Sequence, residues 1–165
     1  MSPATTQSQV TLGILSDTHG LLRPEVLTSL DGVDHILHAG DVGPVWILDE
    51  LGALAPVTAV WGNTDDFGIR DRVREIAKVE VAGLRIAVVH GHQFGSPSPE
   101  RLAGEFPDAD LVVFGHTHQP VTRRIGETWF VNPGSCGPRR FKLPVGLVRG
   151  HLAGGHLELE TVLLD

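Results

Sequence analysis

Short polar loops that carry metal-binding side chains recur along the chain, each directly after a run of apolar residues. Five such loops hold the candidate ligands Asp17, His19, Asp41, Asn63, His90, His116 and His118. Any one loop has an ordinary explanation, because Asp and Asn cap helices or form turns and a histidine can end a buried strand. The same device at the ends of successive apolar runs is hard to obtain from turn chemistry alone. We therefore expect these side chains to meet in one site.

The kinds of ligand narrow the choice of metal. No cysteine lies among these loops, which argues against a structural zinc site or an iron–sulfur cluster. Mixed carboxylate, imidazole and amide ligands suit Mn²⁺, Fe, Zn²⁺ or Ni²⁺. The ligands exceed what one such ion needs when it keeps open positions, so the set predicts two ions. A pair about 3.5–4 Å apart needs a bridging carboxylate, and Asp41 is the natural candidate because its strand lies between those of Asp17 and Asn63.

Two divalent ions at this spacing favour one class of reaction. They lower the pKa of a bound water, which gives hydroxide near neutral pH, and they neutralise phosphoryl oxygens during in-line displacement. The expected chemistry is therefore phosphate-ester hydrolysis, with a metal-bridging hydroxide as the nucleophile.

The loop that holds His116 and His118 indicates how the chain positions its ligands. It follows residues 111–114, an apolar run with two β-branched residues that is typical of a strand buried on both faces. Gly115 lets the backbone leave the strand, and Pro120 ends the excursion. The two histidines are therefore expected at the carboxyl end of a buried strand, where open α/β sheets hold their ligands.

The first half of the chain alternates strands and helices. Strands are expected over residues 10–15, 35–38 and 57–60, separated by helices over residues 22–30 and 44–54. This order calls for parallel pairing with right-handed crossovers.

The second half changes character. Hairpins are expected around residues 82–84 and 126–127, with a helix over residues 99–106 and terminal strands over residues 145–149 and 157–164. An α/β fold with two sheets packed face to face and helices outside fits this order better than one open sheet.

Length and composition limit the kinds of protein that the chain can be. With 165 residues, of which 41% are hydrophobic, it fits a single domain over residues 1–165 with a flexible tail over residues 1–9. The formal net charge of −7 argues against non-specific nucleic-acid binding and against attachment to an anionic membrane. The single cysteine, the lack of an apolar run of ~20 residues and the polar N-terminal residues predict a cytoplasmic protein. Exposed edge strands of the expected hairpins could pair across a homodimer, so a homodimer stays a possible assembly.

Taken together, the motifs resemble those of the calcineurin-like metallophosphoesterase superfamily. The resemblance is carried by Asp17-x-His19, Gly40-Asp41, Gly62-Asn63, His90-Gly91-His92 and Gly115-His116-Thr117-His118. The form of residues 62–65 and the run Asn132-Pro133-Gly134-Ser135 are similar to the small YfcE-type phosphodiesterase branch. The resemblance implies a four-layer α/β/β/α sandwich, in which helices flank two packed mixed β-sheets. It also implies a phosphate-ester substrate, such as a nucleotide or another phosphodiester.

The same resemblance assigns the ligands to two divalent metal ions. It implies that one ion is held by Asp17, His19, Asp41 and His118. It implies that the other ion is held by Asp41, Asn63, His90 and His116. Mn²⁺ is the expected metal, with Ni²⁺, Fe, Zn²⁺, Co²⁺ and Mg²⁺ as alternatives.

One departure from the superfamily pattern concerns the proton donor. Many members carry a histidine directly after the motif asparagine, where it protonates the leaving group, whereas this chain has Thr64. His92 and Asp65 are the remaining candidates for the general acid, and Asp41 and Asn63 act in catalysis as metal ligands. Water on a metal can suffice for acidic leaving groups. We therefore expect slow hydrolysis of alkyl esters relative to aryl esters.

Two other interpretations stay open. A phosphomonoesterase would use the same site. A non-catalytic scaffold would resemble the small retromer subunit, which departs from the ligand pattern at the Gly-Asp and Gly-Asn motifs, whereas this chain keeps Asp41 and Asn63. Outside the ligand set, we expect His38 to support Asp41, and Trp61 to form a wall of the site.

Overall fold

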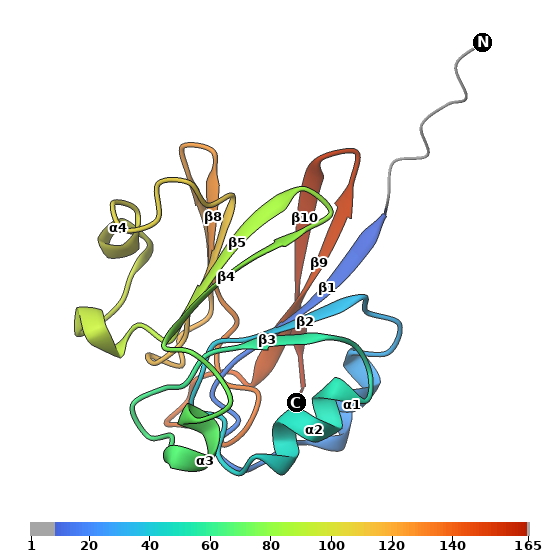
Figure 1. Ribbon diagram of the computed structural model, residues 1–165, viewed down its shortest axis with the longest axis vertical. Helices are drawn as coiled ribbons and strands as arrows, with labels where there is room; N and C mark the ends of the chain where they lie inside the picture. Colours follow the sequence, from blue (N-terminus) through green and yellow to red (C-terminus); the bar gives the residue numbers. More distant parts are fainter. Residues whose placement is uncertain (1–8, 165) are drawn as a thin grey trace.

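The computed structural model describes residues 9–164 as two five-stranded β-sheets that pack face to face, with helices on their outer sides (Figure 1). This architecture confirms the α/β sandwich expected from the order of elements. The tail expected over residues 1–9 lies outside the described residues, apart from Gln9. Among residues 9–164, no helix combines the length and the apolar composition needed to cross a membrane.

The first sheet contains the parallel strands expected from the first half of the chain. Its strands are β1 (Val10–Leu15), β2 (His35–His38), β3 (Val57–Ala59), β9 (Gly146–Ala153) and β10 (His156–Leu163), in the order β10-β9-β1-β2-β3. The strands β1, β2 and β3 are parallel, because α1 (Pro24–Ser29) and α2 (Trp46–Gly52) carry the chain back along the sheet. Strand β9 pairs antiparallel with β1 and forms a long hairpin with β10.

The second sheet combines a parallel centre with antiparallel edges. Its strands are β4 (Ile76–Val81), β5 (Leu84–Val89), β6 (Leu111–Val113), β7 (Val121–Ile125) and β8 (Thr128–Asn132), in the order β4-β5-β6-β8-β7. The strands β5, β6 and β8 are parallel, and the hairpin partners β4 and β7 form the edges. The short helices η1 (His92–Phe94) and α4 (Pro99–Leu102) follow β5, and α3 (Phe67–Arg70) lies in the connection between the two sheets.

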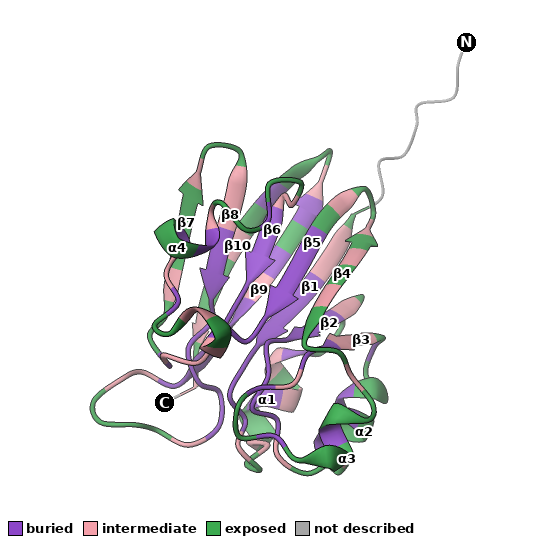
Figure 2. Cartoon of the chain, turned by 60° about the vertical axis from the view of Figure 1, so that its left-hand side comes forward, coloured by how far each residue is buried: buried purple, intermediate pink, exposed green. Residues whose placement is uncertain are grey.

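Three apolar clusters hold the layers together. The space between the sheets is filled by alternate residues of the inner strands, namely Leu12, Ile14, Leu37, Ile86, Val88, Leu111, Val113 and Val131. The outer face of the first sheet packs against Val26 of α1 and Leu51 of α2. The outer face of the second sheet packs Phe130 against Leu102 of α4. Both faces of the central strands are therefore covered, and these strands form the buried centre of the molecule (Figure 2).

Some elements differ in extent from the expectations. The three expected helices are each shorter at one or both ends. Strand β9 is longer than expected, because its pairing with β10 continues to the turn at Gly154 and Gly155, and β10 begins and ends one residue earlier than expected. Helix α3 was not expected, because its four residues are too few to show a helical period. It begins where the Asp66 carboxylate accepts a hydrogen bond from Gly68 N at 3.0 Å.

Candidate metal centre

The candidate ligands come from five loops, each of which leaves the carboxyl end of a strand. Asp17 and His19 follow β1, Asp41 follows β2, Asn63 follows β3, His90 follows β5, and His116 and His118 follow β6. Backbone hydrogen bonds tie these loops together, including Asp17 N to Gly40 O and Gly115 N to His90 O, both at 3.0 Å. The packing of two sheets with parallel central strands therefore brings side chains from separate parts of the chain to one end of the sandwich.

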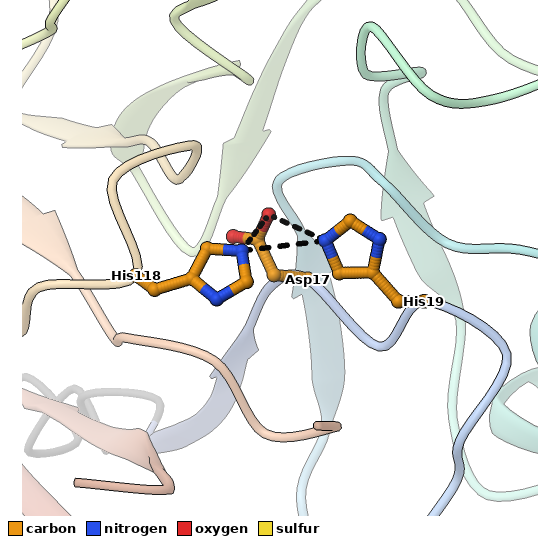
Figure 3. A group of neighbouring side chains, drawn as sticks. All are labelled: Asp17, His19 and His118. Carbon is orange, nitrogen blue, oxygen red and sulfur yellow. Dashed lines mark hydrogen bonds and ion pairs between the residues drawn. The ribbon is translucent and has the colours of Figure 1, made fainter. Parts of the chain in front are cut away.

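A triangle of ligand atoms is formed by Asp17, His19 and His118 (Figure 3). Asp17 Oδ1 lies 3.2 Å from His118 Nε2 and 3.5 Å from His19 Nε2, and the two imidazole nitrogens are 3.3 Å apart. Two ligands that bind one cation at about 2.1 Å are separated by about 3.0–3.4 Å in octahedral or tetrahedral geometry. The triangle therefore has the dimensions of three ligands around one ion.

Asp17 Oδ1 provides an independent test of this fit. The atom is buried and has no hydrogen bond with any of the residues that the structure describes. The other carboxylate oxygen, Oδ2, accepts hydrogen bonds from Ser16 Oγ at 2.6 Å and from His116 N at 3.3 Å. A buried anionic oxygen without a donor is unfavourable, and a cation among the facing nitrogens would compensate its charge. The residues present therefore fit a metal ion.

A second group of ligand atoms is formed by Asp17, Asp41 and His90. His90 Nε2 lies 3.1 Å from Asp41 Oδ2 and 4.0 Å from Asp17 Oδ1. Asn63 Oδ1 approaches the same nitrogen at 3.1 Å. The ring of His116 lies beside that of His90, with 5.2 Å between the centroids. The side chains predicted to hold a second ion are thus neighbours in the structure.

Asp41 belongs to the second group and also approaches the first. Its Oδ2 is 3.1 Å from His90 Nε2 and 3.5 Å from His19 Nε2, and its Oδ1 accepts a hydrogen bond from Thr64 N at 3.0 Å. Asp17 is also shared, because its Oδ1 belongs to both groups. The site therefore offers two buried carboxylates in positions suited to bridge a pair of ions.

The electrostatics of the site keep both carboxylates ionised. Burial acts to raise the pKa of Asp17, but the facing imidazoles of His118 and His19 lower it well below its usual value. Burial also acts to raise the pKa of Asp41, but its contact with His90 lowers this pKa to about 2. Carboxylates must be deprotonated to bind a metal, so both are in the binding state at neutral pH.

Left-handed backbone is concentrated at this site. Seven non-glycine residues have a positive φ among the described residues, and five of them are candidate ligands. These five are Asp17, His19, Asp41, His116 and His118, with φ of 58°, 45°, 52°, 73° and 60°. Such residues are strained by about 1–3 kcal/mol each, and they cluster at functional sites. The left-handed backbone thus includes five of the seven ligands that the sequence pattern predicts.

Two glycines beside the ligands are required by close approaches between loops. A Cβ at Gly62 would lie 2.2 Å from Asp41 Oδ1, and a Cβ at Gly115 would lie 2.2 Å from Ser16 Oγ and 2.6 Å from Asp17 Oδ2. Both glycines directly precede a candidate ligand. The Gly-Asn and Gly-His pairs therefore let one ligand loop pack directly against another.

The run from Asn132 to Ser135 fastens two ligand loops. Asn132 Nδ2 donates hydrogen bonds to Gly115 O at 3.1 Å and Thr117 Oγ1 at 3.0 Å. Ser135 Oγ donates to Asp17 O at 2.9 Å. The run consequently holds the loop after β6 and the loop after β1 in fixed positions.

His38 supports the site indirectly. Its Nδ1 accepts a hydrogen bond from Gly40 N at 3.1 Å, and its Nε2 lies 3.1 Å from Thr18 Oγ1. Thr18 Oγ1 donates to Val42 O at 2.6 Å. The imidazole thus links the loops after β1 and β2 and reaches Asp41 only through the backbone of Gly40. Thr18 was not identified from the sequence, because hydroxyl residues are ordinary in turns.

The two candidate proton donors lie in different surroundings. The Asp65 carboxylate is buried and accepts hydrogen bonds from Gly62 N at 2.8 Å and Gly43 N at 3.1 Å. Both of its oxygens are engaged with backbone, so Asp65 holds loops in place and is poorly suited to donate a proton. His92 is half-buried, with its ring centroid 5.6 Å from that of Trp61. Trp61 therefore lies beside the site and faces His92.

The fold and the side-chain cluster define a class of protein, an α/β sandwich with metal-binding loops at the carboxyl ends of its strands. Comparison with known families agrees with this class. A family model described as the calcineurin-like phosphoesterase superfamily domain matches residues 10–154. The chain belongs to this superfamily, and it is a metal-dependent phosphoesterase.

Individual relatives lead to the same branch. A probable metallophosphoesterase of Methanothermobacter thermautotrophicus is 38% identical over 159 residues, which cover 92% of this chain and 91% of that protein. Phosphodiesterase YfcE of Escherichia coli K12 is 45% identical over 146 residues, which cover 73% of this chain and 76% of that protein. The expected resemblance to the YfcE-type branch is therefore confirmed.

A solved structure shares the fold at low sequence identity. Vacuolar protein sorting 29 from Cryptosporidium parvum superposes with a TM-score of 0.79 and 18% identity, covering 95% of this chain and 98% of that one. At this identity the likeness shows the fold alone.

Proposed function

We propose that this chain is a phosphodiesterase that works with two divalent cations. The observation that supports this most directly is the position of Asp41, whose Oδ2 faces His90 on one side and His19 on the other. Two adjoining groups of ligand atoms around a shared carboxylate are what a two-ion site needs. A relative named as a phosphodiesterase supports a diester substrate, such as a nucleotide ester.

The two ions of this proposal have separate ligands around the shared carboxylate. The first set is Asp17, His19, Asp41 and His118, and the second set is Asp41, Asn63, His90 and His116. Bound cations would acidify water to supply the nucleophile at neutral pH and would neutralise charge on the phosphoryl oxygens. Mn²⁺ is our first choice of metal, because mixed oxygen and imidazole ligands suit it.

The chain itself keeps the ligand atoms oriented. His90 Nδ1 lies 2.7 Å from Ala39 O, and donation to this carbonyl assigns the proton to Nδ1. Nε2, which faces Asp41 and Asn63, is then the atom available to a metal. Thr64 contributes through its backbone N–H, which holds the Asp41 carboxylate.

We propose His92 as the group that passes a proton to the leaving group. Its partial burial lowers the pKa of His92 below the ordinary value, so the ring is mainly neutral near pH 7 and protonates the leaving group weakly. We expect faster hydrolysis of p-nitrophenyl ethyl phosphate than of diethyl phosphate, and His92→Gln should slow the alkyl ester more than the aryl ester. The kcat/KM values of wild type and His92→Gln on the two esters measure both effects. Equal wild-type rates on both esters would contradict the lack of a strong acid, and equal slowing by His92→Gln would contradict the donor role.

The central experiment measures bound metal and hydrolysis on the same protein. Chelator-treated protein is reloaded with Mn²⁺, Ni²⁺, Co²⁺, Zn²⁺ or Mg²⁺ and assayed on bis(p-nitrophenyl) phosphate and on p-nitrophenyl phosphate. We expect about two bound ions per chain and faster hydrolysis of the diester. Asp41→Asn should lower kcat/KM by at least about 100-fold. Asp49→Asn is the matched control, because Asp49 is an exposed carboxylate of α2 that pairs with Arg72.

Each alternative predicts a different result. Faster hydrolysis of the monoester would identify a phosphomonoesterase. A protein that binds no metal and hydrolyses neither ester with any of the five ions would overturn the proposal and favour a scaffold on the same fold.

A further inference from the structure

Arg70, the last residue of α3, is held in place beside the candidate metal centre. Its Cζ lies 4.3 Å from the ring centroid of Trp61, and its Nε donates a hydrogen bond to Asp65 O at 2.8 Å. Trp61 and Asp65 flank Asn63 in the loop that follows β3. Stacking on one face and a fixed Nε leave the guanidinium little rotational freedom.

The two terminal nitrogens of Arg70 have no hydrogen-bond or ion-pair partner within residues 9–164. Two carboxylates of neighbouring segments have other partners. Asp66 accepts a hydrogen bond from Gly68 N at 3.0 Å, and Asp49 pairs with Arg72 at 2.9 Å. Arg70 therefore presents an exposed cation whose two terminal NH2 groups donate to neither carboxylate nor carbonyl of the described chain.

Arg70 lies outside the ring of candidate ligands. Two ring contacts connect Arg70 to the ligands, because the Trp61 ring, on which Arg70 stacks, is 5.6 Å from the His92 ring, which in turn is 5.5 Å from the His90 ring. Helix α3, which carries Arg70, lies at the end of the sandwich to which β3 and its following loop lead (Figure 1). An anion bound by Arg70 would consequently be a different group from a phosphate at the metal ions.

We propose that Arg70 binds a second anionic group of the substrate, so that the preferred substrate class is a phosphodiester that carries a further phosphate. This inference rests on the proposed function. The outer edge of a guanidinium offers paired N–H donors whose geometry matches a phosphate. Because Trp61 and Asp65 O orient the group before binding, less side-chain entropy is lost when the phosphate binds.

A purely structural role is the competing explanation. In that case Arg70 only fastens α3 to Trp61, and its replacement changes the reaction of all substrates alike. A comparison between substrates that differ by one phosphate separates the two explanations.

The test uses the thymidine dinucleotide TpT and its 5′-phosphorylated form pTpT, and the measured quantity is the ratio of their kcat/KM values. Arg70→Met keeps an unbranched side chain over Trp61 without the charge, and Arg70→Lys keeps the charge without the planar fork. Arg72→Met is the matched control, because it removes a cation two residues away that already pairs with Asp49. Thermal unfolding verifies that each variant is folded.

We expect the wild type to prefer pTpT by about tenfold, the effect of one charge-assisted contact. Arg70→Met should abolish this preference, Arg70→Lys should retain part of it, and Arg72→Met should retain all of it. If neither dinucleotide is cleaved, the same ratio is taken from their inhibition constants against bis(p-nitrophenyl) phosphate.

The failure of this inference is distinguishable from the failure of the proposed function. A wild type without the preference, or an Arg70→Met variant that keeps it, overturns the role of Arg70 while diester hydrolysis stands. Absence of hydrolysis of bis(p-nitrophenyl) phosphate with every metal overturns the proposed function, and the inference with it.

Discussion

At the scale of single residues, burial decides the charge of His38. The imidazole is fully buried, and burial lowers its pKa to about 4. In an unfolded chain the pKa of histidine is about 6.5. Between these two pH values the unfolded state binds a proton that the folded state does not bind. The folded state therefore loses stability as the pH falls through this window.

We expect the His38 contribution to the free energy of unfolding of metal-free protein to fall by about 2 kcal/mol between pH 7 and pH 5. His38→Gln should remove this part of the pH dependence, because glutamine keeps an acceptor and a donor but does not titrate. Urea unfolding in the presence of a chelator at the two pH values measures the difference.

The difference between wild type and His38→Gln isolates His38, because both proteins share the other titrating groups of the site. The pKa of Asp41 is lowered from 3.8 to about 2, so its contribution is full above pH 3.8 and is lost only as the pH falls toward 2. Burial acts to lower the pKa of His90, but contact with Asp41 raises it overall. The stability from His90 is thus present at low pH and lost as the pH rises. Equal pH slopes in wild type and His38→Gln would contradict the prediction.

At the scale of elements, the loop after β3 packs against the loop after β2 without room for a side chain. Because a Cβ at Gly62 would lie 2.2 Å from Asp41 Oδ1, Gly62→Ala should displace this carboxylate. We expect metal affinity and kcat/KM to fall by about 10- to 100-fold. Mn²⁺ titration calorimetry and the bis(p-nitrophenyl) phosphate assay measure the two quantities.

A glycine in open space provides the control for this change. A Cβ at Gly52, in α2, meets nothing within 4 Å in the described part of the chain, so Gly52→Ala should leave metal binding and hydrolysis unchanged. A Gly62→Ala protein with wild-type Mn²⁺ affinity would show that the two loops can separate without loss, contrary to the prediction.

The elements were predictable to the extent that their signals are local. Strand β2 was expected over residues 35–38 and is observed as His35–His38, because a short apolar run between turns signals a buried strand. Helix α3 left no such signal, since it depends on one capping contact between Asp66 and Gly68. Local sequence patterns therefore predict the strands of both sheets, but they do not predict a short capped helix such as α3.

The candidate site also has features that the sequence predicts and features that it does not predict. The ligand types and their places after apolar runs are visible in the sequence, so the set could be predicted without coordinates. The sharing of Asp17 by two groups, the backbone hydrogen bonds of Asp65 and the stacking of Arg70 on Trp61 depend on how separate loops meet. Contacts of this kind have no sequence period, and only the folded chain reveals them.

At the scale of the whole molecule, the candidate metal centre joins the two sheets. Asp17 and Asp41 come from loops of the first sheet, whereas His90 and His118 come from loops of the second. Cations held across this junction would bind the folded state and not the unfolded chain, in which the ligands are far apart. Metal binding should therefore stabilise the fold as a whole.

We expect a chelator to lower the midpoint of thermal unfolding, and Mn²⁺ at about 100 times its Kd to add about 2.7 kcal/mol to the free energy of unfolding. Asp41→Asn should lose most of this gain, and Asp49→Asn should keep it. Thermal unfolding of the three proteins with and without Mn²⁺ measures the effect. A wild type that unfolds at the same temperature under both conditions would show that no ion binds across the sheets.

The left-handed backbone at five ligand positions makes the stability of the fold and metal binding competing requirements at these residues. Glycine at any of these positions would relieve about 1 kcal/mol of strain while it removes a ligand. A lineage selected only for a stable fold would consequently erode the centre one position at a time and keep the sandwich intact. We therefore expect glycine at these five places to mark lost catalysis among related sequences.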